Sequence, residues 1–155
     1  MMKLFHLIIS IAIAQSAGIV GSVFTAPNIE GWYSTLAKPV WNPPGWVFGP
    51  VWILLYTLMG IAAFLVWRQR DVPGSKLALS VYGVHLALNA LWSIVFFGLK
   101  NPGLALAEIL VLLAFILATT VLFRRINNWA GALLVPYIAW VTFATFLNFT
   151  IWQLN

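Results

Sequence analysis

Residues 104–123 read LALAEILVLLAFILATTVLF, and this run decides the fold class. It holds one ionisable side chain, Glu108, near its beginning. An α-helix rises about 1.5 Å per residue, so a run of this length crosses the ~30 Å hydrocarbon core of a bilayer. We therefore interpret residues 104–123 as a transmembrane helix.

Four further apolar runs of similar length lie on either side of this one. Backbone polar groups inside lipid must be satisfied within a helix or a closed barrel, and these runs are too long for barrel strands. The sequence therefore predicts an all-α membrane protein, a five-transmembrane-helix bundle folded as one domain over residues 1–155. The other four helices are expected at about Leu4–Phe24, Trp46–Trp67, Lys76–Phe97 and Ala130–Gln153.

The composition points to the same class of protein. Apolar residues make up 63% of the chain and charged residues 7%, and the mean hydropathy is +0.98. Soluble domains carry roughly 25% charged residues. A soluble fold of this length would lack the polar side chains to cover its surface, so we expect lipid to cover it.

The connection between the first two predicted helices, from Thr25 to Gly45, is unusually long. It contains four prolines and three large aromatic residues, and flexible linkers do not have that composition. We expect a structured loop that folds as a cap over one end of the bundle. The alternative is an interfacial aromatic belt. The residues concerned are Pro27, Pro39, Pro43, Pro44, Trp32, Tyr33 and Trp41.

The net charge of +5 comes from Lys and Arg at the predicted helix ends, so we interpret it as a signal of orientation and not of nucleic-acid binding. Lys38 and Lys100 fall on one side of the bilayer, and six basic residues fall on the other. This bias places the N-terminus in the cytoplasm if the protein lies in a plasma or inner membrane. The six are Lys3, Arg68, Arg70, Lys76, Arg124 and Arg125.

The first apolar run has an alternative interpretation as a signal peptide. The triplet Ala12-Ile13-Ala14 resembles a cleavage site. Hydrophobicity continues to Phe24, however, which favours a retained helix. Its small residues are then expected to form a surface for close helix packing. These residues are Ala14, Ala17, Gly18, Gly21 and Ser22.

The residues of conventional catalysis are sparse in this chain. It has no cysteine, which excludes disulfides, thiolate nucleophiles and zinc–thiolate sites. Two His and three acidic residues, widely separated, form no metal-ligand pattern. No serine lies in a triad-like arrangement, and no glycine-rich loop could hold phosphate. We expect no metal site and no required cofactor.

Aromatic residues are abundant instead: nine Trp, four Tyr and eleven Phe. Three of the predicted helices carry aromatic and polar residues at steps of three or four, which places them on one face of each helix. These faces are His85, Asn89, Trp92 and Phe96; Trp52 and Tyr56; and Pro136, Trp140, Ala144 and Asn148.

Such faces have two interpretations. They could line a pocket for a flat, apolar, aromatic ligand with a few polar edges. They could equally be packed core, in which His85, Asn89 and Asn148 tie the helices together. The spacing leaves both open. Glu108 could snorkel, pair with a basic group or line a proton path, and His6 is expected near the membrane interface.

The same residues resemble the tryptophan-rich sensory protein / translocator protein family (TspO/MBR, or peripheral benzodiazepine receptor family). The similarity covers the connection after the first helix and the second, third and fifth helices. It rests on Trp32-Tyr33, Leu36, Lys38-Pro39, Trp41, Pro43-Pro44, Trp46, Phe48, Trp52 and Leu55-Tyr56; on Asn89, Trp92 and Phe96-Phe97; and on Pro136-Tyr137, Trp140, Phe143-Ala144-Thr145 and Leu147-Asn148.

The resemblance implies a five-helix bundle in the lipid bilayer, often a homodimer, with a ligand cavity closed by the first loop. It implies binding of porphyrins such as protoporphyrin IX, and in several members of sterols and isoquinoline drugs. The family's sterol motif is incomplete here, since Leu147, Phe149 and Gln153 lack its phenol and its cation. Carried over by position, the ligand-binding residues are Tyr33, Trp52, Tyr56, His85, Asn89, Trp92, Phe96, Trp140 and Ala144.

The function that this resemblance implies first is a membrane receptor or sensor that binds tetrapyrroles and transports them. One alternative is a light-dependent porphyrin-degrading enzyme, in which Trp52 and Trp140 would be the catalytic residues. Another is a passive transporter of other small apolar ligands such as sterols. All three need the same aromatic cavity.

Overall fold

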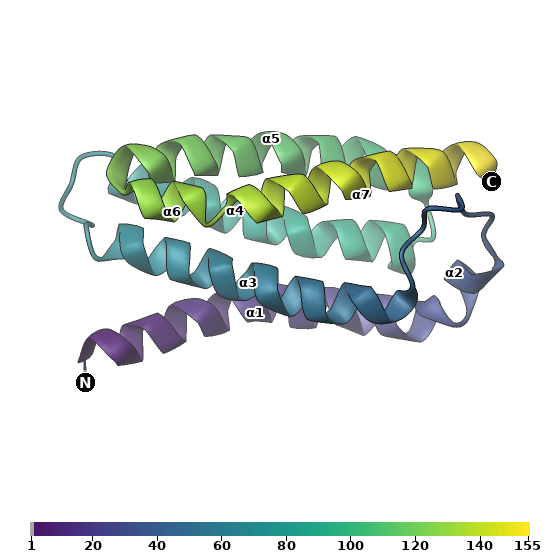
Figure 1. Ribbon diagram of the computed structural model, residues 1–155, viewed down its shortest axis with the longest axis horizontal. Coiled ribbons are helices and arrows are strands. Elements are labelled where there is room, and N and C mark those ends of the chain that lie inside the picture. Colours follow the sequence, from purple (N-terminus) through teal and green to yellow (C-terminus); the bar gives the residue numbers. More distant parts are fainter. Residues whose placement is uncertain (1) are drawn as a thin grey trace.

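The computed structural model describes residues 2–155 as a bundle of helices that run along one common axis (Figure 1). Five helical stretches are long and apolar enough to cross a membrane, which confirms the predicted fold class. The elements are α1 (Met2–Ile29), α2 (Trp32–Thr35), α3 (Gly45–Trp67), α4 (Ser75–Ser93), a π-helical turn η1 (Ile94–Gly98), α5 (Pro102–Ile126), α6 (Asn128–Ala132) and α7 (Val135–Leu154).

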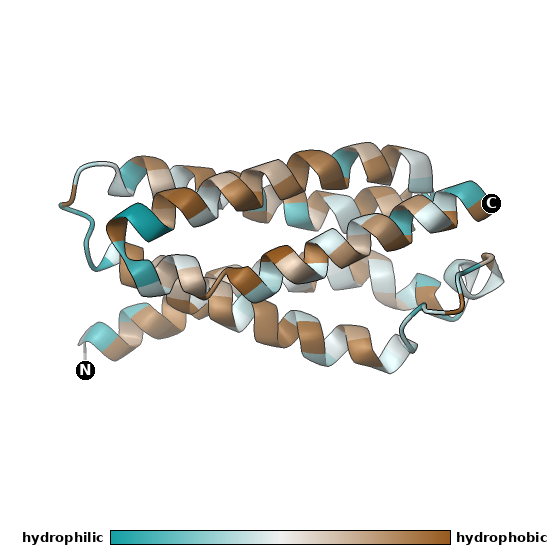
Figure 2. Ribbon diagram, turned by 45° about the horizontal axis from the view of Figure 1, so that its top comes forward, coloured by the Kyte–Doolittle hydropathy of each residue, from teal (hydrophilic) through white to brown (hydrophobic). Residues whose placement is uncertain are grey.

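The long helices form one bundle, and the two ends of the chain lie at opposite ends of it (Figure 1). α1 packs against α3 and α4, and α5 packs against both α4 and α7. Hydrophobic residues cover the middle of the helices, whereas hydrophilic residues gather toward the loops and helix ends (Figure 2). Exposed Ile8, Val23 and Leu110 illustrate the apolar outer surface that a bilayer would cover.

Of the small residues predicted to pack the first helix against its neighbours, all but the exposed Ser22 lie in those contacts. Ala14 is fully buried. A Cβ atom on Gly18 would lie 2.4 Å from the Tyr56 ring, and one on Gly21 would lie 2.9 Å from the Ser93 hydroxyl. A side chain at either position would force Tyr56 of α3 or Ser93 of α4 to move, so close packing favours glycine at both.

The predicted long loop from Thr25 to Gly45 is not confirmed at that length. α1 continues through Pro27 to Ile29, a two-residue turn leads to the short helix α2, and the remaining non-helical backbone is residues 36–44. A proline removes one hydrogen bond to the carbonyl four residues earlier, which costs little in a final turn. The Asn28 side chain also donates to the Phe24 carbonyl oxygen there, at 2.9 Å.

The fifth predicted helix is interrupted, which the sequence prediction missed. α6 ends at Ala132 and α7 begins at Val135. Pro136 has no N–H for the Ala132 carbonyl, and its ring disfavours the helical conformation in the residue before it. The break follows from this proline. The Asn127 side chain begins α6 by accepting hydrogen bonds from the amides of Trp129 and Ala130.

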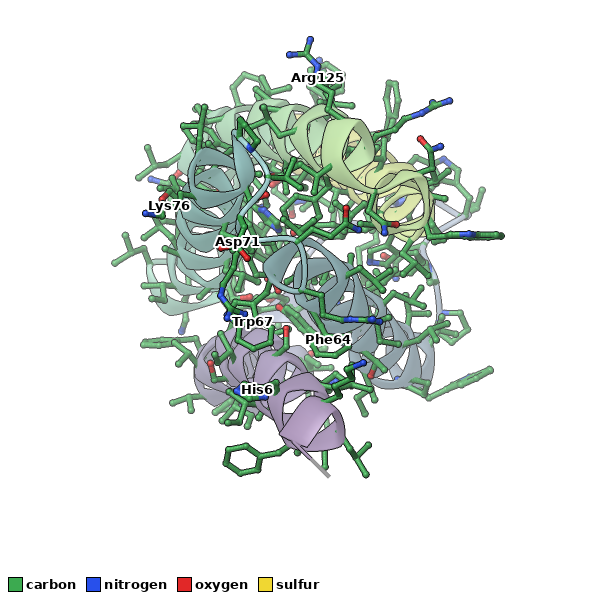
Figure 3. All side chains as sticks on the ribbon, turned by 90° about the vertical axis from the view of Figure 1, so that its left-hand side faces the viewer. His6, Phe64, Trp67, Asp71, Lys76 and Arg125 are labelled. Atoms are coloured by element: carbon green, nitrogen blue, oxygen red, sulfur yellow. The ribbon has the colours of Figure 1, made fainter. Side chains whose placement is uncertain are left out.

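The basic residues are sorted between the two ends of the bundle as predicted. Figure 3 looks onto the end that carries the N-terminus and shows Lys76 and Arg125 at its outer edge. His6 lies at this end and stacks on Trp67, with ring centroids 4.4 Å apart. Lys38 and Lys100 belong to the connections at the opposite end. Which compartment each end faces stays a prediction.

Candidate functional site: an aromatic cavity in one half of the bundle

A cavity of about 560 Å³ lies inside the half of the bundle nearest α2. The residues around it come from the second half of α1, the first half of α3, the junction of α4 with η1, the beginning of α5 and the later part of α7. Its aromatic walls are formed by Tyr33, Trp46, Phe48, Trp52, Tyr56, Trp92, Phe96, Phe97 and Trp140.

These aromatic side chains pack on one another around the cavity. Trp52 stacks on Tyr56 with ring centroids 5.4 Å apart, and the Trp92 ring stacks on Phe96 at 4.9 Å. Trp140 meets Phe48 edge to face at 6.0 Å. Aromatic pairs of these geometries attract one another beyond their burial alone. The walls are therefore held in place before any ligand binds.

A hydrogen-bonded bridge crosses the wall through Asn89. The Tyr56 hydroxyl donates to Asn89 Oδ1, and Asn89 Nδ2 donates to the Tyr137 hydroxyl at 2.7 Å. All three side chains are buried. The bridge joins α3, α4 and α7, and it satisfies polar groups that would be costly in an apolar interior.

A second bridge joins α4, α7 and α5. Trp92 Nε1 donates to Asn148 Oδ1 at 3.1 Å, and Asn148 Nδ2 donates to the Pro102 carbonyl oxygen at 2.8 Å. Both asparagine amides thus bond to protein atoms. The cavity consequently has few free polar groups, so a ligand would be recognised mainly by shape and stacking.

The loop after α2 lies at the end of the bundle nearest the cavity (Figure 1). The Tyr33 hydroxyl donates to Asn42 Oδ1 at 2.8 Å, and the Tyr33 ring packs beside Phe97, with ring centroids 5.7 Å apart. Burial raises the pKa of Tyr33 to about 12, and the hydrogen bond to Asn42 opposes part of that rise. The phenol therefore stays neutral at physiological pH and keeps its donor proton.

Two further sets of contacts hold this loop down. Lys38 Nζ donates to the carbonyl oxygens of Tyr33 and Leu36, at 2.7 and 2.9 Å. The last residue, Asn155, forms two hydrogen bonds with the backbone of Ala37, each at 3.0 Å. The loop is therefore fixed to the C-terminal end of α7.

Comparison with known proteins places this chain in a family. The profile of the TspO/MBR family matches residues 10–153. The chain belongs to the TspO/MBR family. It is 40% identical to the tryptophan-rich protein TspO of Chlorobaculum tepidum, over 99% of this chain and 98% of that protein. It is 48% identical to the tryptophan-rich sensory protein of Cereibacter sphaeroides, over 81% and 78%. It is 41% identical to the human translocator protein, over 92% and 86%.

The cavity of this TspO/MBR protein brings together eight of the nine predicted ligand-binding residues. Trp52 from α3 and Trp140 from α7, the two tryptophans predicted for photochemistry, both line it. Ligand binding itself stays a prediction. The eight are Tyr33, Trp52, Tyr56, Asn89, Trp92, Phe96, Trp140 and Ala144.

His85 lies outside the cavity wall, one turn before Asn89 on the same face of α4. It is fully buried, and its Nδ1 atom is 3.1 Å from the Thr119 hydroxyl of α5. Its ring packs against Tyr82 and Tyr137. Helical spacing predicts the shared face but not how deep the cavity extends along it, so His85 belongs to the packed part of the bundle.

Gln15 of α1 lines the cavity and was missed from the sequence. Its Nε2 atom donates to the Ile53 carbonyl at 3.0 Å and to the Thr57 hydroxyl at 3.1 Å. It is the one amide side chain in the first apolar run, which was the available signal. The other cavity residues of α1 are small or aliphatic and give no such signal.

Glu108 of α5 has both carboxylate oxygens buried, with no hydrogen-bond partner among residues 2–155. It lies on the same face of α5 as the buried residues Ala105, three positions earlier, and Leu112, four positions later. It does not line the cavity. Of the three roles predicted for Glu108, pairing with a basic group is not found among residues 2–155. Snorkelling and lining a proton path stay predictions.

Proposed function

We propose that this protein is a membrane receptor or sensor that binds a flat, largely apolar tetrapyrrole such as protoporphyrin IX in the aromatic cavity. The observation that carries the proposal is the cavity itself. Its volume of about 560 Å³ lies within the range of known small-molecule sites, about 300–1,000 Å³. Its walls present indole, phenol and phenyl faces from several helices, which suit a planar aromatic ring.

The relatives support the same class of function. Those with substantial identity carry the names tryptophan-rich sensory protein and translocator protein. These names describe sensing and translocation, which favours a receptor over an enzyme for the chain described here. Transport of the ligand is part of the proposal.

The location of the cavity predicts how a porphyrin would lie. A porphyrin such as protoporphyrin IX carries two carboxylates on one edge, and charge is costly in the middle of a bilayer. The cavity occupies the half of the bundle nearest α2. We expect the carboxylate edge to point toward the loop over residues 36–44, and the apolar edge toward Tyr56 and Asn89.

The proposal is tested by truncating one aromatic wall. Loss of a central aromatic anchor commonly costs about 2 kcal/mol or more of binding free energy, so Trp140→Ala should weaken protoporphyrin IX binding about tenfold or more. The matched control is Trp129→Ala, because Trp129 is 75% exposed on α6 and outside the cavity. Fluorescence quenching titrations of detergent-solubilised protein measure both. Unchanged affinity in folded Trp140→Ala protein would place the ligand elsewhere.

A second candidate function is light-dependent porphyrin breakdown, favoured by one observation. Trp52 and Trp140 line the same cavity from α3 and α7, so a bound porphyrin would lie near two oxidisable indoles. Phe keeps an aromatic face but is much harder to oxidise. If the indoles act as electron donors, Trp52→Phe/Trp140→Phe protein should bind porphyrin yet lose the photoreaction. If wild type and double variant both bleach porphyrin at the rate of the free pigment, the enzyme function is refuted and the receptor function stands.

A further inference from the structure

The line along which α1 and α3 lie side by side, here called the seam, is tightly packed at the end that carries the N-terminus. Ser10 Oγ donates to the Gly60 carbonyl at 2.7 Å, and a Cβ atom on Gly60 would lie 2.5 Å from Ile11 Cα. Further along, Gln15 bonds to the Ile53 carbonyl. The two helices approach so closely that nothing passes between them there.

The two helices meet again near α2, and the residues of α1 and α3 that line the cavity lie between these two contacts. A Cβ atom on Gly45 would lie 3.8 Å from Ile29 Cγ2, which is ordinary contact. The preceding glycine of α1 in tight contact with α3 is Gly18, against Tyr56. From residue 18 to residue 29 an α-helix rises about 16 Å, which is the greatest height that an open stretch between the two contacts can have.

The open stretch joins the cavity to the outer surface. Ile19, Ser22 and Ala26 of α1 and Trp46, Gly49 and Ile53 of α3 all line the cavity, and all six are also exposed. Ile19 is 65% exposed, Trp46 77% and Ile53 61%. Exposed fractions this large, on residues at the edge of the cavity lining, indicate that the cavity reaches the outer surface between these two helices.

The opening faces lipid by its position and by its chemistry. It lies partway along two membrane-spanning helices, and the surface beside it is apolar, with Val23 and Leu54 exposed. The one hydroxyl on its rim, that of Ser22, donates to the Ile19 carbonyl of its own helix at 2.8 Å. The rim carries no charge. It therefore suits an apolar molecule and not water or an ion.

We propose that the seam between α1 and α3 is a lateral portal through which an apolar ligand exchanges between the cavity and the lipid phase. The proposal rests on the proposed function only for the identity of that ligand. The alternative route, past the loop over residues 36–44, is disfavoured because the Tyr33–Asn42 hydrogen bond and the two bonds between Ala37 and Asn155 hold this loop in place.

Substitution of one glycine should plug the portal, and the same substitution at a second glycine serves as the matched control. Gly49 lies on its rim, and a Cβ atom there meets nothing within 4 Å. Gly83 of α4 is also exposed and meets nothing within 4 Å, but it lies away from the cavity. Gly49→Phe should therefore obstruct the portal without straining the bundle, and Gly83→Phe should leave it open.

The first readout needs no porphyrin. The chain has no cysteine, so Ala144→Cys places a single thiol on the cavity wall. In lipid vesicles, alkylation of this thiol by a lipid-partitioning maleimide should slow about tenfold or more when Gly49→Phe is added, and should be unchanged with Gly83→Phe. A charged, water-soluble maleimide should react far more slowly than the apolar one in either background.

A second pair of variants guards against misfolding. Ser22 and Ser16 are both exposed on α1, and each donates its hydroxyl to the carbonyl three residues earlier. Only Ser22 lines the cavity. Ser22→Phe should slow the alkylation, and Ser16→Phe should not. Alkylation unaffected by both plugs, or equally fast with the charged reagent, would overturn the portal.

Porphyrin kinetics then separate this inference from the proposed function. If protoporphyrin IX is the ligand, Gly49→Phe should slow both its association and its dissociation, because an obstruction on the route raises the barrier in both directions. Slowed alkylation together with no porphyrin binding by wild type would refute the proposed ligand and keep the portal. Normal porphyrin binding with unslowed alkylation would refute the portal alone.

Discussion

Replacing Asn89 by leucine tests whether the bridge across the cavity wall stabilises the bundle. Asn89 is 4% exposed, accepts a hydrogen bond from Tyr56 and donates one to Tyr137. Leucine has a similar volume, so Asn89→Leu removes both bonds while leaving little empty space. The variant also leaves two buried hydroxyl groups without this partner.

The expected cost follows from the two lost interhelical bonds. Hydrogen bonds between membrane helices contribute on average about 0.6 kcal/mol each, and at most about 1.7 kcal/mol. Asn89→Leu should therefore lower the free energy of unfolding by about 1–3 kcal/mol. Reversible unfolding in mixed micelles, followed by circular dichroism, measures this difference.

The matched background is the double variant Tyr56→Phe/Tyr137→Phe. Without the two hydroxyls the amide of Asn89 has neither partner, so replacing it by leucine should be nearly neutral or stabilising. The difference between the two backgrounds isolates the bridge. An equal cost of Asn89→Leu in both would show that the loss comes from packing, and the reasoning from hydrogen bonds would be wrong.

Three further predictions concern other parts of the molecule. Gly60→Leu should destabilise the bundle by more than about 1 kcal/mol, because the new Cβ would meet the backbone of Ile11. Gly83→Leu should be tolerated, because open space surrounds that position. Thermal unfolding of the two variants measures the difference. Folding raises the pKa of Tyr33 from 10.0 to about 12, so its contribution to stability is present below pH 10 and is lost as the pH rises through about 12. Tyr33→Phe should accordingly make the alkaline fall in unfolding free energy shallower, and an unchanged slope would show that this phenol is not the responsible group. A reporter fused after Asn155 should be non-cytoplasmic if the protein lies in a plasma or inner membrane, because six of the eight basic residues gather at the opposite end; a cytoplasmic signal would reverse the proposed orientation.

Helix number and position could be predicted from the sequence because spanning a bilayer is a local requirement. Each segment must supply about 20 apolar residues and satisfy its own backbone. Residues 104–123 meet that requirement without reference to any other part of the chain. The predicted helix boundaries were wrong near two prolines, because a proline can either lie within a terminal turn of a helix or interrupt a helix. Pro27 lies inside α1, whereas Pro136 accompanies the break between α6 and α7.

The cavity could be predicted only as a set of candidate residues. Spacing places His85, Asn89 and Trp92 on one face of α4, but it does not tell where that face packs and where it lines a cavity. The structure buries His85 against Thr119 and places Asn89 and Trp92 at the cavity wall. Their hydrogen-bond partners come from other helices, so the distinction depends on the distances between helices.

The opening beside α1 shows the same limit most clearly. Sequence by itself determined that α1 is a membrane helix with small residues on one face. Whether those residues seal the seam or border an opening depends on α3, which lies against α1 at Gly60 and at Gly45 but leaves Ser22 and Gly49 exposed on the cavity rim. Helix separation arises from contacts between residues 16 to 49 positions apart, Ile29 with Gly45 and Ile11 with Gly60, and no local pattern encodes it.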